Sequence, residues 1–364
     1  MKLLKNKDKE ILNIALPAIV ANITVPLLGL VDVAITGHLG NAAYIAAIAV
    51  GSMLFNVIYW VFGFLRMGTS GMTAQAYGRG DSAETMLLLM RGLCVALAVA
   101  LAVLVLQRPL LALAISVMGV EPSLQPLVRT YFQICVWGAP AMLCLYAFTG
   151  WFIGLQNTRI TMMVSIVQNI VNIVASLTLV YGMGMKIDGV ATGTLIAQWG
   201  GLLVAASYAC LKHRGLLRSL SLRAVTRGEA LMRFFNVNRD IFLRTLFLVA
   251  VNLFFVSAGA TQGTVVLAVN TLLMQLFTLF SYVMDGFAYA GEALCGKYAG
   301  AGDRTGFHAT VRRLFVWGAI LTTAYTAVYA LGGNTFLSLL TDDAPVLAAA
   351  AQYLPWAVAI PMAG

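Results

Sequence analysis

Long apolar stretches follow one another through this chain, separated by short turns. A helix that crosses a bilayer needs about 20 predominantly apolar residues, and most of these stretches are at least that long. We expect helices near residues 11–36, 42–75, 85–107, 127–155, 161–183, 189–211, 241–260, 264–298, 309–332 and 346–364. The alternating pattern of barrel strands is absent, so the sequence predicts an all-α polytopic membrane protein.

The composition agrees with this interpretation. Of the 364 residues, 60% are hydrophobic and only 10% are charged, and the mean hydropathy is +0.88. Soluble globular domains do not have such a composition. The first stretch is too long for a signal peptide and contains Asp32, so we expect it to be a membrane helix.

The net charge of +9 could suggest nucleic-acid binding, but the basic residues are placed otherwise. They gather before the first stretch and after the second, fourth, sixth and eighth, whereas the alternate turns are poor in them. They include Lys2, Lys5, Lys7, Lys9, Arg79, Arg159, Lys212, Arg214, Arg218, Arg223, Arg227, Arg233, Arg239, Lys297, Arg304, Arg312 and Arg313. This positive-inside pattern places the N-terminus in the cytoplasm and predicts a multi-pass protein of the cytoplasmic membrane. We expect the lipid bilayer and a small organic substrate as its partners, no nucleic acid, and a monomer.

A self-comparison of the chain reveals an internal repeat at an offset of 222 residues, the difference between 300 and 78. The offset pairs 78–81 with 300–303, Gly37 with Gly259, Phe55 with Phe277, Arg91 with Arg313, and Tyr131 with Tyr353. A unit of about six helices crosses the membrane an even number of times, so both copies begin on the same side. Two parallel six-helix repeats are therefore expected around a central cavity. Residues 1–211 would form an N-terminal lobe, 212–240 a basic cytoplasmic connection and 241–364 a C-terminal lobe.

The second copy of the repeat is expected to be truncated. Its match to residues 131–140 runs into the last residues of the sequence, and nothing corresponds to the part after Pro140. About ten helices would then be present of an expected twelve, and the offset predicts a parent chain of about 435–440 residues.

Asp32 is the one charged residue in the first apolar stretch. A carboxylate at bilayer depth costs about 2.5–3.5 kcal/mol on insertion scales, so it is retained where it is paired, solvated or protonated. Pro26 cannot donate to the carbonyl of Asn22, so we expect the helix to bend or loosen there. A bendable helix with a single acid indicates a helix whose conformational change is coupled to protonation. The alternative is an acid buried against a base for packing.

A polar stripe runs along the predicted helix 264–298 at spacings of three, four, three, four and three. It consists of Gln275, Thr278, Tyr282, Asp285, Tyr289 and Glu292. At about 100° per residue these side chains share one face of the helix. They indicate a cavity wall that attracts cationic amphiphiles, or alternatively acids that pair with Arg66 or Lys297. We place Arg66 at the same cavity, as a base that snorkels or pairs with an acid.

Signals for an enzyme or a metal site are weak. The Gly-x-Gly at 182–184 lies in a turn with no preceding strand, and no P-loop lysine motif exists, so we expect no nucleotide and no cofactor. His38, His213 and His308 are far apart and near loops, which predicts no metal site. The five cysteines fall in apolar stretches and are expected to be small core residues: Cys94, Cys135, Cys144, Cys210 and Cys295.

Residues 31–40, with the sequence Val-Asp-Val-Ala-Ile-Thr-Gly-His-Leu-Gly, resemble the opening motif of the multidrug and toxic compound extrusion (MATE) transporters. Residues 64–69 with 75–78, and 285–288 with 292–294, are similar to the DinF branch of that family. The resemblance covers essentially the whole chain, and its specificity comes from the combination of motifs.

The resemblance implies twelve helices in two lobes and export of organic, often cationic or amphipathic compounds in exchange for protons or sodium. It makes Asp32 the proton carrier, with Asn172 and Thr194 as its neighbours. Many relatives have a second acid four residues beyond the position of Asn172, where this chain has Ser176. That difference favours protons over a two-carboxylate sodium site.

Three hypotheses follow. The first is a proton-coupled antiporter that works by alternating access. The second is a flippase for lipids or lipid-linked precursors on a related fold, which would need a more basic cavity than the acids on helix 264–298 indicate. The third is an intramembrane enzyme, for which no catalytic spacing is found.

Overall fold

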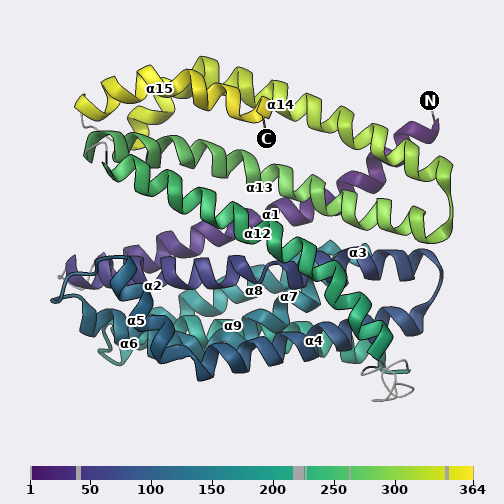
Figure 1. Cartoon of the computed structure of the whole chain (residues 1–364), viewed down its shortest axis with the longest axis horizontal. Helices are drawn as coiled ribbons and strands as arrows, with labels where there is room; N and C mark the ends of the chain where they lie inside the picture. Colours follow the sequence, from purple (N-terminus) through teal and green to yellow (C-terminus); the bar gives the residue numbers. More distant parts are fainter. Residues whose placement is uncertain are drawn as a thin grey trace.

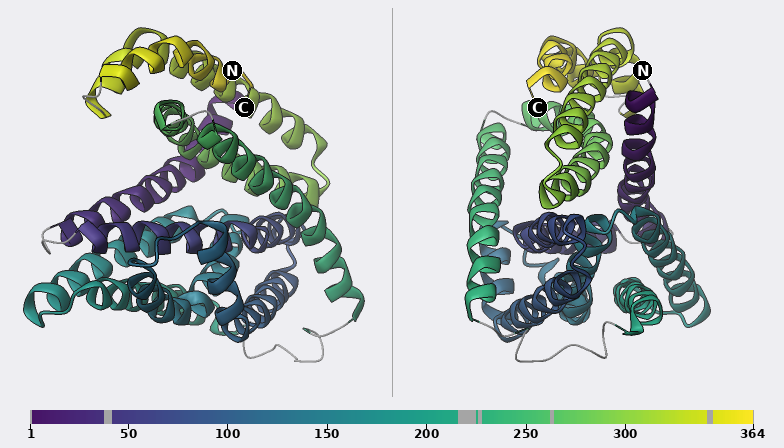
Figure 2. Two further views of the ribbon diagram at one scale, coloured as in Figure 1. Left: turned by 60° about the vertical axis from the view of Figure 1, so that its left-hand side comes forward. Right: turned by 90° about the vertical axis from the view of Figure 1, so that its right-hand side faces the viewer.

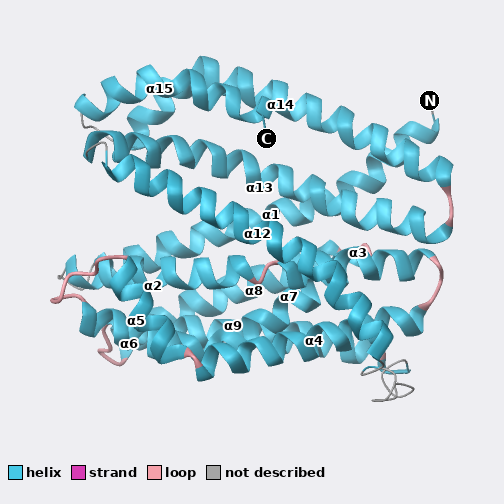
Figure 3. Cartoon of the chain, viewed as in Figure 1, coloured by secondary structure: helices cyan, strands magenta, loops and turns pink. Residues whose placement is uncertain are grey.

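The computed structural model describes residues 2–37, 42–215, 225, 228–261, 264–340 and 344–363, and every structural statement below refers to these ranges. Within them the chain is helical and contains no strand (Figure 3). The all-α class predicted from the sequence is therefore confirmed.

Nine helices form the N-terminal part of the described chain. They are α1 (Lys2–Gly37), α2 (Ala42–Val61), α3 (Phe64–Gly78), α4 (Ser82–Val105), α5 (Gln107–Val117), α6 (Gln125–Cys135), α7 (Ala139–Gly154), α8 (Thr158–Leu177) and α9 (Ile187–Lys212). Four more follow: α12 (Gly228–Thr261), α13 (Thr264–Ala301), α14 (Arg304–Leu340) and α15 (Ala344–Ala363). Eight stretches of the described residues are long and apolar enough to cross a membrane. The two remaining predicted spans fall within α1 and α12, where several side chains lie outside the described residues.

Several predicted helices differ from the observed ones. The span 42–75 is two helices, α2 and α3, separated by a turn in which the Gly63 amide donates to the Trp60 carbonyl at 3.0 Å. The span 127–155 is interrupted by a 3₁₀ turn at Val136–Gly138, just before Pro140, which has no amide hydrogen to donate. The short helix α5 was not predicted, and α8 ends in a wide turn at Thr178–Gly182. In addition, α12 begins at Gly228, inside the predicted connection 212–240.

The first helix runs without interruption from Lys2 to Gly37. The expected loosening near Pro26 is therefore not seen as a break in the helix, and the packing of that side chain lies outside the described residues. His38, Leu39 and Gly40, the last residues of the motif at 31–40, also lie outside them.

Two groups of helices form the molecule, and α1 and α12 run between them. Figure 1 shows α13, α14 and α15 above, with α2 to α9 below. The first helix packs against both α8 and α13, and α12 contacts α2 and α3 as well as α13 (Figure 2). Apolar side chains of α1 and α13 share one core, which includes Ile11, Ile14, Phe287 and Leu294.

The turn before α4 and the turn before α14 have the same geometry. Gly80 and Gly302 have positive φ angles of 75° and 70°, which a residue with a Cβ adopts only at a cost. Asp81 caps α4 by accepting from the Glu84 amide at 2.9 Å, and Asp303 accepts from the Gly306 amide at 2.8 Å. These positions are the ones that the 222-residue offset pairs.

The seam between α3 and α13 is built from small residues. A Cβ at Gly78 would collide with the carbonyl of Lys297, and a Cβ at Gly300 would collide with the carbonyl of Gln75. The offset pairs Gly78 with Gly300 and Gln75 with Lys297, so the two contacts are equivalent under the predicted repeat. A two-fold relation between the halves would produce this reciprocity, although the repeat itself stays a prediction.

Candidate functional site

Asp32 is buried near the C-terminal end of α1, with 6% of its surface exposed. The Thr36 hydroxyl donates to its backbone carbonyl at 2.7 Å, which does not satisfy the carboxylate. The carboxylate oxygen Oδ1 has no hydrogen-bond partner among the described residues, and no basic side chain of that set pairs with it. Among the described residues, Asp32 therefore lacks the counter-ion that the packing alternative requires.

Asn172 and Thr194, the predicted neighbours of Asp32, are brought together by α8 and α9. The Asn172 amide donates to the Thr194 hydroxyl at 3.1 Å, and Asn172 is completely buried. Gly193 allows the close approach, because a Cβ there would collide with Ser176. The Asn172 Oδ1 and the Ser176 hydroxyl have no partner in the described structure. Unpaired buried oxygens are costly, so this region is suited to a proton, a water molecule or a hard cation.

Two residues near Asp32 were not assigned to the site from the sequence. Tyr131 and Cys135 on α6 both interact electrostatically with Asp32, and the Tyr131 hydroxyl lies 3.2 Å from that of Ser52. They follow Asp32 in the chain by about 100 residues, so no local spacing could have identified them.

The polar stripe of α13 lies on the accessible face of that helix. Gln275 and Asp285 are exposed, and Thr278, Tyr282, Tyr289 and Glu292 are half-buried. The other face is buried and includes Leu276, Phe280, Phe287 and Leu294. The Asn22 amide of α1 donates to the Tyr282 carbonyl at 3.2 Å, so part of the stripe faces the first helix. The Thr278 hydroxyl is bonded within its own helix, to the Met274 carbonyl at 2.8 Å.

Glu292 is paired with a base, as the alternative interpretation of the polar stripe proposed. The guanidinium of Arg66 on α3 lies 3.5 Å from the Glu292 carboxylate and 4.1 Å from the centre of the Tyr289 ring. Asp285 interacts electrostatically with the same guanidinium. Lys297, the other candidate base, instead donates to the Gln156 side chain at 3.4 Å.

A polar clamp joins the N-terminal end of α1 to α14, outside the apolar stretch. Asp8 accepts two hydrogen bonds from the Arg313 guanidinium, at 2.5 and 2.6 Å, and a third from the Trp317 indole at 3.0 Å. The bonds from Arg313 hold the pKa of Asp8 below its ordinary value. Lys7 and Glu10 both bond to the Tyr298 hydroxyl of α13. The chain end and α14 lie side by side in Figure 1.

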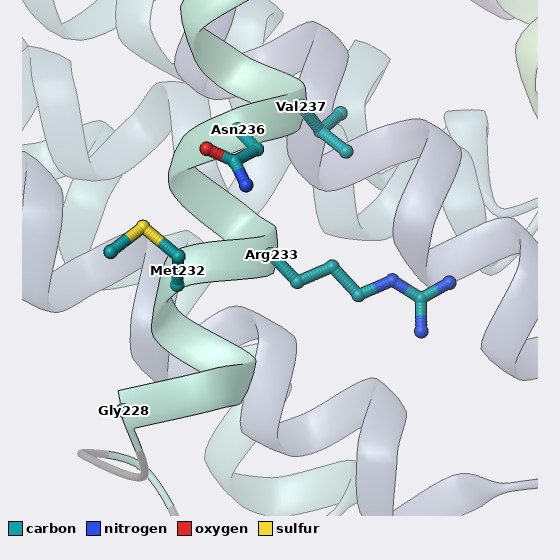
Figure 4. A pocket seen from close by; sticks show the side chains of 5 residues that line it. All are labelled: Gly228, Met232, Arg233, Asn236 and Val237. Atoms are coloured by element: carbon teal, nitrogen blue, oxygen red, sulfur yellow. The ribbon is translucent and has the colours of Figure 1, made fainter.

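The described cavities lie away from these sites. One, of about 660 Å³, is an open groove on the N-terminal half of α12, lined by Gly228, Met232, Arg233, Asn236 and Val237 (Figure 4). A smaller one, of about 250 Å³, lies between α5 and α6 and is lined by Gln107, Arg108, Leu111, Phe132, Gln133 and Trp137. Neither contains a predicted site residue, and the described residues contain no acid, histidine or cysteine cluster that would hold a metal.

The expectation that all five cysteines are core residues is wrong for two of them. Cys94 and Cys210 are exposed, Cys135 and Cys144 are buried, and Cys295 is intermediate. An apolar side chain on a membrane helix can face lipid as favourably as it faces the protein core, so position in an apolar stretch does not predict burial.

Comparisons with known proteins agree with this architecture. The family described as MatE matches residues 17–178 and 241–362. The chain is 36% identical over 366 residues to DNA damage-inducible protein F of Escherichia coli, covering 100% of this chain and 79% of that protein. It is 31% identical over 207 residues to the probable multidrug resistance protein NorM of Shewanella oneidensis, covering 55% of this chain and 44% of that one.

Solved structures have the same fold. A crystal structure of MATE in the bent conformation superposes with a TM-score of 0.85 at 20% identity, over 99% of this chain and 81% of that chain. A point mutant of the Vibrio cholerae MATE transporter VcmN superposes with a TM-score of 0.85 at 18% identity, over 99% of this chain and 82% of that chain.

Proposed function

Because this chain belongs to the MatE family of membrane transporters, we propose that it is a secondary antiporter coupled to protons. It exports organic, often cationic and amphipathic compounds by alternating access between the two groups of helices. Its relatives include proteins named as multidrug resistance proteins, which supports this class of substrate.

The state of Asp32 is the observation that carries the proposal. A buried carboxylate without a counter-ion is stable when it holds a proton and is strained when it is charged. Loss of the proton therefore favours a rearrangement that gives the carboxylate water or a polar partner. Asn172 and Thr194 supply such partners on the adjacent helices. Ser176 stands where a second acid would complete a two-carboxylate sodium site, so protons are favoured over sodium.

Substrate binding is assigned to the space between the two groups of helices. Arg66 comes from one group and the α13 stripe from the other, so a ligand there contacts both. Tyr282 and Tyr289 offer aromatic faces to a cation, and Asp285 and Glu292 offer negative charge. Gln275 and Thr278 extend the same wall.

The remaining assignments follow from the sequence patterns. The basic turns favour a cytoplasmic N-terminus in the cytoplasmic membrane. The reciprocal seam of α3 and α13 supports two parallel repeats with the lobes at 1–211 and 241–364, joined through 212–240. No cofactor other than the coupling ion is proposed, and the protein is expected to act as a monomer.

A lipid flippase is the less favoured function. An anionic headgroup needs uncompensated positive charge in the cavity. Arg66 is already paired with Glu292, and Asp285 adds further negative charge beside it.

The test is dye efflux from vesicles that contain the protein, with proton and sodium gradients imposed separately. Wild-type protein should export an organic cation under the proton gradient, and Asp32→Asn should reduce this export to the level of empty vesicles. Asp240→Asn is a matched control, because Asp240 lies outside the predicted spans in an exposed ion pair with Arg239. Continued export against a gradient by Asp32→Asn would refute the proposal.

A further inference from the structure

The guanidinium of Arg66 occupies a site that has the chemistry of an organic-cation receptor. It lies over the Tyr289 ring at 4.1 Å and beside the Glu292 carboxylate at 3.5 Å. A cation over an aromatic face with a carboxylate at its edge is the arrangement by which proteins recognise organic cations. Arg66 lies on α3, and Tyr289 and Glu292 lie on α13.

The pair is partly exposed, and its contact is long. The side chains of Arg66 and Glu292 are 13% and 25% exposed, and a single N–O distance of 3.5 Å joins them. A strong arginine–carboxylate pair is bidentate at about 2.7–2.9 Å, and the Asp8–Arg313 pair of this protein is close to that geometry. The Arg66–Glu292 contact is therefore much easier to exchange than the clamp at the end of α1.

We propose that Arg66 is a built-in cation that occupies the face of Tyr289 and the carboxylate of Glu292, and that a planar organic cation binds by displacing it. This inference rests on the proposed function and specifies the ligand class of that site. The displaced guanidinium has Asp285 as an alternative partner, since the two groups already interact electrostatically. One cation is thereby exchanged for another, and no carboxylate is left without a cation beside it.

The geometry also sets what the ligand must offer. A displacing group needs a delocalised positive charge that stacks on a ring, and it needs enough apolar surface to outweigh the tethered side chain. Small hydrated cations such as potassium meet neither requirement. Arg66 thus acts as a selectivity filter that weakens the binding of every cation and excludes those that stack poorly.

The experiment measures binding of ethidium, a planar monocationic dye, by fluorescence anisotropy in detergent with no gradient. Arg66→Gln removes the internal competitor from the Tyr289 ring and the Glu292 carboxylate, so the Kd for ethidium should fall about tenfold, which corresponds to about 1.4 kcal/mol. Arg66→Lys keeps a positive charge but stacks less well on the ring, so it should lower the Kd for ethidium by a smaller factor. A neutral phenanthridine of similar size should bind wild type and Arg66→Gln equally.

A rescue measurement separates competition from a merely structural role. Methylguanidinium should compete with ethidium in Arg66→Gln, where the site is vacated, and should have little effect on wild type. An unchanged or increased Kd in both Arg66→Gln and Arg66→Lys would overturn the inference. If Arg66→Gln does not fold, the lower ethidium Kd expected for Arg66→Lys tests the inference.

The outcome is independent of the antiport assay. Wild-type binding without tighter binding in the variants would refute the role of Arg66 and leave the proton-coupled export intact. Tighter binding in the variants together with efflux by Asp32→Asn would refute the coupling and retain the role of Arg66. Absence of ethidium binding to wild type and both variants would refute the organic-cation site itself.

Discussion

Asp32 and Glu292 are both carboxylates on long apolar helices, but only Glu292 has a base beside it. Glu292 lies 3.5 Å from Arg66, whereas an oxygen of Asp32 has no partner in the described structure. A paired carboxylate keeps its charge, because its partner offsets the loss of water. An unpaired one is tolerated chiefly when it is protonated. Under the proposed mechanism, the first helix carries the carboxylate that titrates, and α13 carries a carboxylate that is paired with a base.

The largest effect on stability is expected at the paired site. Glu292→Gln leaves the guanidinium of Arg66 without its carboxylate, and breaking a buried ion pair costs about 3–5 kcal/mol. Because Glu292 is 25% exposed and Asp285 lies nearby, we expect a smaller loss, about 2–3 kcal/mol. Denaturant titration in mixed micelles measures this loss in the free energy of unfolding.

The double variant Arg66→Gln/Glu292→Gln sharpens that result. It removes both charges, so it should be more stable than Glu292→Gln alone by about 1–2 kcal/mol. Equal stability of the single and double variants would mean that the two side chains are not coupled in the folded protein.

A change of the opposite sign is expected at the unpaired site. Asp32→Asn replaces a group that must keep a proton with one that is always neutral, so the free energy of unfolding should stay constant or rise by about 0.5–1 kcal/mol. The same titration measures it, with Asp240→Asn as the surface control. A loss as large as that of Glu292→Gln would show that Asp32 has a hidden counter-ion.

A pH-dependent effect is expected at Asp8, outside the membrane-spanning region. Its pKa is lowered by Arg313, so its contribution to stability is present above its unfolded-state value, about 4, and is lost as the pH falls through the lower folded-state value. Asp8→Asn should therefore reduce the melting temperature at pH 7 and have no effect at a pH below both values. A pH-independent difference between Asp8→Asn and wild type would contradict this ion pair.

The sequence predicted the parts of the fold that depend on periodicity. The apolar stretches located the membrane helices, and the spacing of the polar residues identified the accessible face of α13. The breaks at Gly63 and at Val136–Gly138 were missed, because a turn that is followed by another apolar helix leaves the hydropathy pattern unchanged.

Long-range partners were harder to predict. The sequence proposed both Arg66 and Lys297 for the α13 acids, and only the packing of α3 on α13 distinguishes them. Tyr131 near Asp32 and Arg313 beside Asp8 come from distant helices, so the order of residues gave no indication of those contacts. The seam between Gly78 and Gly300 shows the converse, since the repeat offset had already paired the residues that meet there.

The protonation change at Asp32 is tested most directly by counting protons when substrate binds. Purified wild-type protein in weakly buffered detergent should release about one proton per ethidium bound, detected by a pH-indicator dye, and Asp32→Asn should bind ethidium with no release. Equal proton release from wild type and Asp32→Asn would contradict the account, because the exchanged proton would then come from another group.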